Sequence, residues 1–366
     1  MRWQKSHGRH DLPWQNTRDA YRIWVSEIML QQTQVAAVIP YFERFMERFP
    51  NVKRLARGSS DEVMRRWAGL GYYSRARNLH AAAKIIARDY GGAFPEIAAE
   101  IETLPGIGRS TAAAIAAFAF GERSAILDGN VKRVLCRAFG IEGNPSEKPV
   151  ENKLWRLAES LLPKTTIESY TQALMDLGAT LCTRSRPACA ACPLRAECVA
   201  YRDGRAAELP RRRPRRAVPK RAIAMLVLFD GDAVLLEKRP PSGIWGGLWS
   251  LPEAPIDADW NAECLTRFGI RKVKPELLER FTHGFTHFKL TIQPVLVRIA
   301  TEPASRVAEP GSRWLNLSGA HDAGLPMPVK RLLGELAIAS QNRHSVDSPA
   351  NRAARGFQKN NVQKSK

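Results

Sequence analysis

The chain has 366 residues, and its 56 Lys and Arg against 36 Asp and Glu give a formal charge of +20. This length is more than twice that of an ordinary domain, so we expect two domains, and the charge favours a polyanion, above all nucleic acid, over a neutral metabolite. The longest apolar run, Ala112 to Phe120, is far below the roughly 18 residues of a membrane span, which excludes a transmembrane protein. The polar, basic N-terminus lacks the apolar core of a secretory signal, so we expect a cytoplasmic protein whose cysteines are thiols or metal ligands.

The pattern of apolar residues divides the chain into two domains. Apolar positions at helical spacing predict an all-α domain over residues 1–201. Residues 202–221 hold nine Lys or Arg, two acids and three prolines, a composition that predicts a linker too charged to pack. Apolar runs at 222–229, 233–239 and 288–300 predict strands and 327–340 predicts a helix, giving an α+β domain over 222–340. The polar, basic residues 341–366 predict a disordered tail.

The first strongly apolar segment, Asp19 to Val35, predicts one helix. On it Trp24, Glu27, Gln31 and Gln34 are spaced to share a face. The apolar neighbours of Glu27 would remove water from its carboxyl group and raise its pKa, so that it could donate a proton near neutrality. On this pattern alone, a solvent-facing Glu in a salt bridge is the commoner outcome.

A glycine-rich turn follows at residues 104–111, with Gly106 and Gly108 between two helical patterns. It is typical of a helix-hairpin-helix, in which the second helix, here about Arg109 to Phe120, offers its free amide groups to a phosphate. An ordinary turn between helices is the alternative. Asp128 lies 20 residues after Gly108, where it is either a catalytic carboxylate or only the N-cap of the helix predicted from Val131 to Phe139.

Four of the six cysteines are clustered in a C-x6-C-x2-C-x5-C pattern: Cys182, Cys189, Cys192 and Cys198. Four thiolates within so short a segment indicate a metal site, for which tetrahedral zinc is one alternative. The spacing resembles that of the endonuclease III superfamily of DNA glycosylases, and this resemblance implies a [4Fe-4S] cluster held by residues 182–198.

Three further segments identify the family more closely: residues 12–14, 26–35 and 69–79. They resemble the corresponding segments of MutY-type adenine DNA glycosylases, across nearly the whole helical part. The resemblance implies a helix-hairpin-helix glycosylase domain with an iron-sulfur cluster loop. It also implies a monomeric, nucleoid-associated base excision repair enzyme that flips adenine, mispaired with 8-oxoguanine or guanine, out of double-stranded DNA. In it Glu27 protonates adenine N7 and later handles the attacking water, while Asp128 stabilises the sugar cation.

The resemblance also assigns residues that contact DNA. The expected adenine pocket is lined by Leu12, Trp14 and Gln172, with Gln15 where some relatives have Arg. Gln32 and Tyr72 are expected to enter the base stack beside the lesion. Residues 2–12 look like the end of the family's first helix with its beginning absent.

Ser110 decides between two reaction types. Bifunctional relatives carry a lysine at this position of the hairpin, which attacks the sugar and leads to strand cleavage. Ser110 therefore predicts a monofunctional enzyme. A bifunctional pyrimidine-lesion glycosylase/lyase of the endonuclease III type and a non-catalytic DNA-binding protein stay open as alternatives.

The second domain contains a segment, residues 239–249, that is similar to the Nudix-like lesion-recognition domain of this family. Phe285, Thr286 and His287 stand at the family's Phe-Ser-His loop, which reads 8-oxoguanine; Thr286 keeps the hydroxyl group and adds a methyl group. Residues 261–263 lack the paired acids that bind magnesium in a Nudix hydrolase, so we expect binding without hydrolysis.

Overall fold

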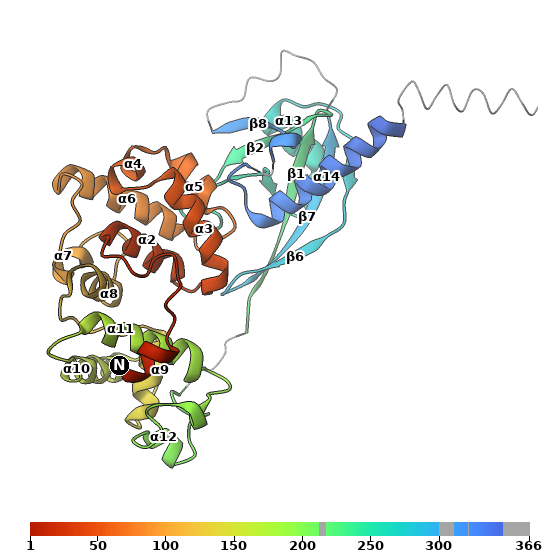
Figure 1. The fold of residues 1–366 in the computed structure, drawn as a ribbon. Coiled ribbons are helices and arrows are strands. Elements are labelled where there is room, and N and C mark those ends of the chain that lie inside the picture. Colours follow the sequence, from red (N-terminus) through yellow and green to blue (C-terminus); the bar gives the residue numbers. More distant parts are fainter. Residues whose placement is uncertain (212–216, 300–310, 321, 347–366) are drawn as a thin grey trace, which may run out of the picture. The chain divides into compact units, whose positions relative to one another are not determined.

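The computed structural model describes residues 1–211, 217–299, 311–320 and 322–346. The chain divides into two compact units, Met1–Arg215 and Arg216–Lys366. The first is helical and the second is built on a mixed sheet (Figure 1). The predicted combination of an all-α domain and an α+β domain is confirmed. Among the described residues, no helix combines the length and the apolarity that crossing a membrane requires.

The helices of the first unit form two groups, with α2 to α8 in one and α1 and α9 to α12 in the other (Figure 1). Their bounds are α1 Arg2–His7, α2 Ala20–Leu30, α3 Val35–Arg48, α4 Val52–Arg57, α5 Ser60–Trp67, α6 Ser74–Asp89, α7 Ala98–Glu102, α8 Arg109–Phe120, α9 Gly129–Ala138, α10 Lys148–Ser160, α11 Ile167–Asp176 and α12 Val199–Arg202. One π-helical turn, Leu177–Leu181, continues α11.

The helix predicted over residues 19–35 is interrupted. Asp19 starts α2 by accepting a hydrogen bond from the backbone N–H of Tyr21 at 2.9 Å. The helix ends at Leu30, and α3 begins only at Val35. The prediction that Gln31 and Gln34 share a helical face with Glu27 is therefore wrong: both lie in the break between the two helices.

The predicted hairpin connects α7 to α8. Gly106 has a φ of +78°, and a Cβ atom there would lie 2.6 Å from the Cβ of Asn78, so only glycine fits. Gly108 is the N-cap of α8 and makes no side-chain capping bond. A Cβ atom at Gly108 would meet nothing within 4 Å. The space beside Gly108, at the start of α8, is therefore open.

The predicted linker is only partly a linker. After α12, Leu209 is 2% exposed, and its carbonyl oxygen accepts a hydrogen bond from Nε of Arg137 at 2.8 Å. Arg205 forms an ion pair with Glu142 at 2.7 Å. The burial of Leu209 and the ion pair of Arg205 thus hold residues 205–209 against the rest of the first unit, although the composition of this segment predicted that it would not pack. Residues 212–216 lie outside the described residues.

The second unit has a mixed sheet with the strand order β3-β2-β1-β7-β5, in which β4 also pairs with β1, β6 with β7 and β8 with β2. Its strands are β1 Lys220–Phe229, β2 Ala233–Lys238, β3 Trp249–Ser250, β4 Glu253–Ala254, β5 Pro275–Leu277, β6 Phe281–Gly284, β7 Lys289–Arg298 and β8 Ser312–Asn316. β1 and β7 are parallel, in register from Lys220 opposite Lys289 to Phe229 opposite Arg298, and the other pairs are antiparallel.

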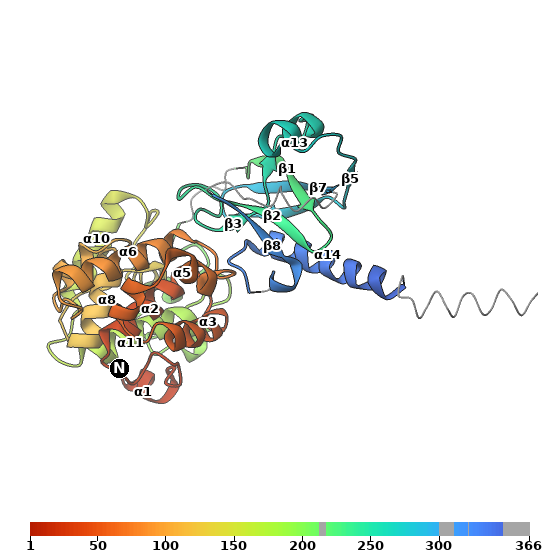
Figure 2. The same ribbon diagram turned by 90° about the horizontal axis from the view of Figure 1, so that it is seen from above.

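Two helices cover this sheet from opposite sides, α13 (Trp260–Phe268) and α14 (Met327–Val346) (Figure 2). Cys264 of α13 packs with Leu226 and Val295 in a buried apolar cluster. α14 runs six residues beyond the end predicted at residue 340. The rest of the predicted disordered tail, residues 347–366, lies outside the described residues.

Candidate active site

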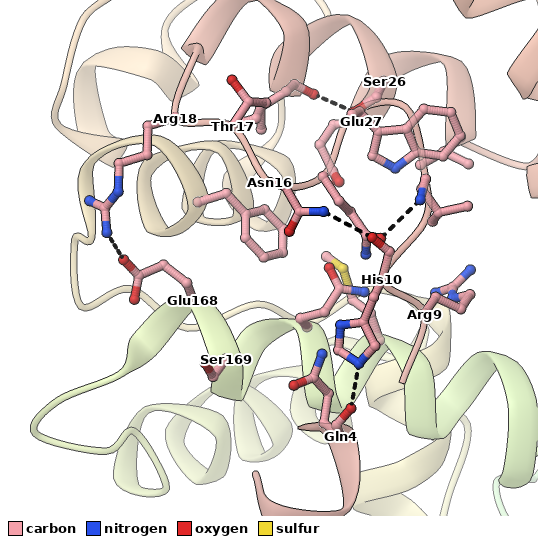
Figure 3. Close-up of a pocket in the computed structure, with 18 residues that line it drawn as sticks. Gln4, Arg9, His10, Asn16, Thr17, Arg18, Ser26, Glu27, Glu168 and Ser169 are labelled. Carbon is pink, nitrogen blue, oxygen red and sulfur yellow. Dashed lines mark hydrogen bonds and ion pairs between the residues drawn. The ribbon is translucent and has the colours of Figure 1, made fainter. Parts of the chain in front are cut away.

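A cavity of about 640 Å³ opens between the two groups of helices of the first unit. Its walls come from α2, from the segment between α1 and α2, from α8 and from α11 (Figure 3). The volume lies in the range of small-molecule sites. The cavity is lined by Glu27 and by all three of the predicted pocket residues, Leu12, Trp14 and Gln172.

Glu27 lies on α2 among side chains that are almost fully buried, including Trp24 and Met29, both 0% exposed. This burial raises the pKa of the Glu27 carboxyl group to about 7. The value of about 7 also includes the negative charge of Asp128, which raises the pKa, and the positive charge of Arg9, which lowers it. The cavity therefore has on its wall a carboxyl group that can hold a proton at neutral pH.

Asp128 is the N-cap of α9, and its Oδ1 accepts a hydrogen bond from the backbone N–H of Val131 at 2.7 Å. Its Oδ2 lies 3.4 Å from the side-chain nitrogen of Asn130. Burial raises the pKa of Asp128, and these hydrogen bonds lower it. The residue is both the helix cap that the sequence allowed and a close electrostatic neighbour of Glu27.

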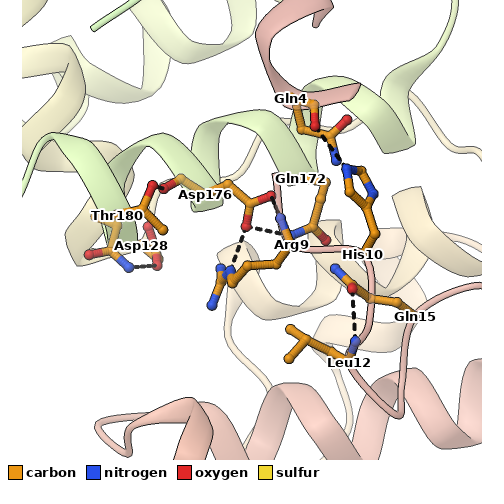
Figure 4. Close-up of polar contacts among 10 residues, drawn as sticks. Gln4, Arg9, His10, Leu12, Gln15, Asp128, Gln172, Asp176 and Thr180 are labelled. Carbon is orange, nitrogen blue, oxygen red and sulfur yellow. Dashed lines mark hydrogen bonds and ion pairs between the residues drawn. The ribbon is translucent and has the colours of Figure 1, made fainter. Parts of the chain in front are cut away.

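The wall behind the cavity contains an ion pair that sequence reasoning missed. Asp176 is fully buried and accepts hydrogen bonds from Nε of Arg9 at 2.7 Å and from Nε2 of Gln172 at 2.9 Å (Figure 4). The side-chain amide of Gln172 is thus held in place from behind. The four-residue spacing of Gln172 and Asp176 on one helix was the available signal. Nothing local in the sequence pointed to Arg9.

Trp14 and Gln15, which line the cavity, are held by contacts with neighbouring groups. Trp14 is 8% exposed and packs edge-on against Phe42, with ring centroids 5.3 Å apart. The side-chain oxygen of Gln15 accepts a hydrogen bond from the backbone N–H of Leu12 at 3.2 Å. Gln15 therefore keeps its NH₂ group available on the wall of the cavity.

Gln32 and Tyr72 do not line the cavity. Both are exposed, and both have the left-handed backbone conformation, with φ of +57° and +47°. Ser110 lies in the first turn of α8, where its Oγ accepts a hydrogen bond from the backbone N–H of Leu127 at 2.9 Å. This bond joins the hairpin to the segment that leads into Asp128.

The four predicted cysteine ligands border one small cavity, which is also lined by Arg137. Arg137 donates a hydrogen bond to Sγ of Cys182 at 3.3 Å. Within the described ranges, no group of three or more Cys, His, Asp or Glu is arranged to hold one metal ion. Four thiols around a shared cavity fit a polynuclear cluster, whose iron atoms take four cysteine ligands between them.

In the second unit, the predicted lesion-reading residues occupy the turn between β6 and β7. The ring of Phe285 stacks on Phe288 with centroids 4.4 Å apart and contacts Trp245 at 5.6 Å, while Thr286 and His287 are exposed. This places two exposed polar side chains beside an aromatic cluster.

Three acidic residues of this unit, Glu237, Glu253 and Glu263, are paired with arginines. Arg239 contacts Glu253 at 2.9 Å, and Arg267 contacts Glu237 at 2.8 Å and Glu263 at 3.5 Å. Carboxylates engaged in this way are poorly suited to bind magnesium, in agreement with the missing acids of a Nudix hydrolase.

Family models match both units. Residues 25–160 match that of the HhH-GPD superfamily base excision DNA repair proteins, and residues 224–335 match that of the NUDIX domain. The fold of the first unit resembles the structure of a thermostable thymine-DNA glycosylase, with a TM-score of 0.51 and 31% identity, over 55% of this chain and 93% of that one. The fold and the site together thus define a base excision DNA repair glycosylase that carries a Nudix-like domain.

Curated relatives narrow this class. The adenine DNA glycosylase of Buchnera aphidicola subsp. Acyrthosiphon pisum is 37% identical over 91% of this chain and 95% of its own length. That of Homo sapiens is 32% identical over 94% of this chain and 76% of its own length. The chain belongs to the adenine DNA glycosylase family.

Proposed function

We propose that the protein hydrolyses the N-glycosidic bond of adenine that is paired with 8-oxoguanine or guanine in double-stranded DNA, after the adenine has been flipped out of the helix. The observation that carries the proposal is Glu27, a carboxyl group with a pKa of about 7 on the wall of a base-sized cavity and electrostatically coupled to Asp128. The two groups supply an acid and a fixed negative charge, as bond cleavage with cationic character requires.

The proposed reaction has two steps. Glu27 donates its proton to N7 of adenine, and the C1′–N9 bond breaks with its electron pair leaving on the base. Asp128 stabilises the positive charge that develops on the sugar. Water then adds to C1′ while Glu27 takes up its proton, so the products are free adenine and an abasic site.

The described residues favour a monofunctional reaction. Ser110 has no amine, and its hydroxyl group is occupied by the backbone of Leu127. Lys132, the nearest lysine in sequence to Asp128, has its Nζ at 2.7 Å from Glu151. This ion pair engages the only amine group that Lys132 has. We therefore expect the strand to stay intact after adenine release.

The proposed partner is duplex DNA bound by a monomer in the cytoplasm, at the nucleoid. The open N-terminus of α8 suits a phosphate, and Gln32 and Tyr72 suit insertion into the base stack. The exposed Thr286 and His287, beside the Phe285 cluster, suit recognition of the oxidised guanine.

Single-turnover assays on duplex containing adenine opposite 8-oxoguanine test the function. We expect Glu27→Gln to release adenine at least about 100-fold more slowly than the wild type, because it removes the proton donor. Glu47→Gln, an exposed glutamate on α3, is the matched control and should keep the wild-type rate. Equal rates for Glu27→Gln and wild type would overturn the proposed chemistry. Strand cleavage without added base would favour the lyase, and absence of any product from the wild type would favour a binding protein.

We propose that Cys182, Cys189, Cys192 and Cys198 hold a [4Fe-4S] cluster. The cluster would cross-link the loop that bears them; the hydrolysis itself involves no change of oxidation state. Protein purified without oxygen should contain about four irons per chain and be brown. Cys182→Ser should lose this iron, whereas the buried Cys136, which is outside the cavity, should tolerate replacement by Ala with the iron retained. Zinc in place of iron in the wild type would contradict the assignment.

A further inference from the structure

Two turns of the first unit share one unusual property. Gln32 lies in the turn between α2 and α3, and Tyr72 lies in the turn between α5 and α6. Each has a positive φ, a conformation that residues other than glycine seldom adopt, and each side chain is exposed. Such a conformation persists only where the surroundings fix it.

A single side chain contacts both turns. Arg75, in the first turn of α6, is 7% exposed. Its Nη1 donates to the carbonyl oxygens of Ile28 at 2.9 Å, Met29 at 2.7 Å and Gln31 at 2.6 Å. These carbonyl groups lie at the C-terminal end of α2, where no helical partner is available to them and where the helix dipole favours a cation.

The other terminal nitrogen of Arg75 holds the second turn. Nη2 lies 3.2 Å from the carbonyl oxygen of Gly71 and 3.4 Å from that of Leu70, and also 3.2 Å from Oγ1 of Thr33 in the first turn. The guanidinium carbon lies 5.3 Å from the centre of the Tyr72 ring. The guanidinium group of Arg75 therefore binds the residues on both sides of Gln32. It also binds the two residues that precede Tyr72.

We propose that Arg75 is a positioning residue for base extrusion, which holds both turns in the shape that lets Gln32 and Tyr72 enter the duplex together. This inference rests on the proposed function. The guanidinium group is suited to the task because its donors point in fixed, coplanar directions toward two separate loops. A lysine has three donors on one atom and cannot reach both sets of acceptors at once.

The test measures extrusion directly. Duplex with 2-aminopurine, a fluorescent adenine analogue, opposite 8-oxoguanine is mixed with protein in a stopped-flow instrument, and the fluorescence rise reports unstacking. We expect Arg75→Lys to extrude the base about 10- to 100-fold more slowly than the wild type, because Gln32 and Tyr72, which take the place of the base in the duplex, are misplaced in this variant. Arg88→Lys, an exposed residue of the same helix, should extrude at the wild-type rate.

A double-mutant cycle separates positioning from a general structural role. In a Gln32→Ala, Tyr72→Ala background, Arg75→Lys should slow extrusion by less than about twofold more, because its targets are already gone. The same slowing in both backgrounds, or loss of cooperative thermal unfolding in Arg75→Lys, would overturn the inference, as would a wild-type extrusion rate in Arg75→Lys. Failure of adenine excision by a wild type that still extrudes 2-aminopurine would count against the proposed function alone.

Discussion

The surroundings of Glu27 let its carboxyl group keep a proton near neutral pH. A glutamate on the surface has lost its proton long before neutrality, whereas burial among the α2 side chains and the charge of Asp128 raise the pKa of Glu27 to about 7. Arg9 acts in the opposite direction but is itself paired with Asp176, which limits its effect. The balance of these neighbours determines whether one carboxyl group is a proton donor.

The raised pKa predicts a pH profile. Because the proton must be present on Glu27 for the first step, the single-turnover rate should be high below about pH 7 and fall about tenfold per pH unit above it. With an ordinary glutamate, the rate would already decrease as the pH rises above about 4. DNA binding measured at the same pH values controls for loss of affinity. A rate that stays level to about pH 9 would contradict this role of Glu27.

At the scale of elements, the N-cap of α9 contributes both to the stability of the helix and to the proposed chemistry. Asp128 caps the helix through Val131 and also carries the charge that faces the sugar in the proposed reaction. The helix then continues to Arg137, which contacts Cys182 of the cysteine loop. One short helix thus connects the candidate catalytic carboxylate with the candidate cluster.

Substitutions of Asp128 should separate the two roles. Asp128→Asn keeps a capping oxygen, so thermal stability should change by less than about 0.5 kcal/mol while adenine release falls at least about 100-fold. Asp128→Ala should also lose about 1 kcal/mol of stability, measured by denaturant unfolding. Asp259→Ala, which removes the cap of α13, should lose stability without a change in adenine release. Wild-type release by Asp128→Asn would contradict a role for its charge.

Some of the secondary-structure elements could be predicted from the local sequence, and others could not. The local pattern of apolar residues predicted α8 and the central strands, because each of these elements contains a continuous apolar run that is buried. It did not predict the end of α2 at Leu30, because the carbonyl groups there are bound by Arg75, more than 40 residues away in sequence. The same holds for Leu209, which is fixed by Arg137.

The residues of the candidate site likewise divide into those that were predicted from the sequence and those that were missed. Glu27 and Asp128 were assigned through the resemblance to the glycosylase family, because the local pattern alone favoured a solvent-facing glutamate at one position and allowed a plain helix cap at the other. Arg9 and Asp176 were missed because their pairing joins the N-terminal segment to α11, and no short-range pattern records such a contact. The joint position of Gln32 and Tyr72 likewise follows from tertiary contacts.

At the scale of the whole molecule, the positive charge is unevenly compensated. Many arginines are already paired with carboxylates, as Arg298 is with Glu276 and Arg331 with Glu335. The run of basic residues at 211–216 holds five arginines within six positions, and only Arg211 belongs to the described residues. We interpret this run as a source of phosphate contacts.

Salt dependence of DNA binding tests this interpretation. Neutralising Arg211, Arg212, Arg213, Arg215 and Arg216 should flatten the plot of log binding constant against log salt concentration, by up to about 0.9 in slope for each phosphate that the protein no longer neutralises. Neutralising the paired Arg298 and Arg331 should leave the slope unchanged. An unchanged slope in the first variant would make residues 211–216 a spacer that does not touch DNA.

The arginine–glutamate pairs of the second unit have a consequence for the conditions under which it can work. Arg239 and Arg267 are counter-ions attached to the backbone, in contact with acidic side chains of the kind that would otherwise attract a dissolved cation. Because these arginines are part of the chain, neither dilution nor a chelator can remove them. The acidic side chains that Arg239 and Arg267 contact therefore need no dissolved cation to neutralise them.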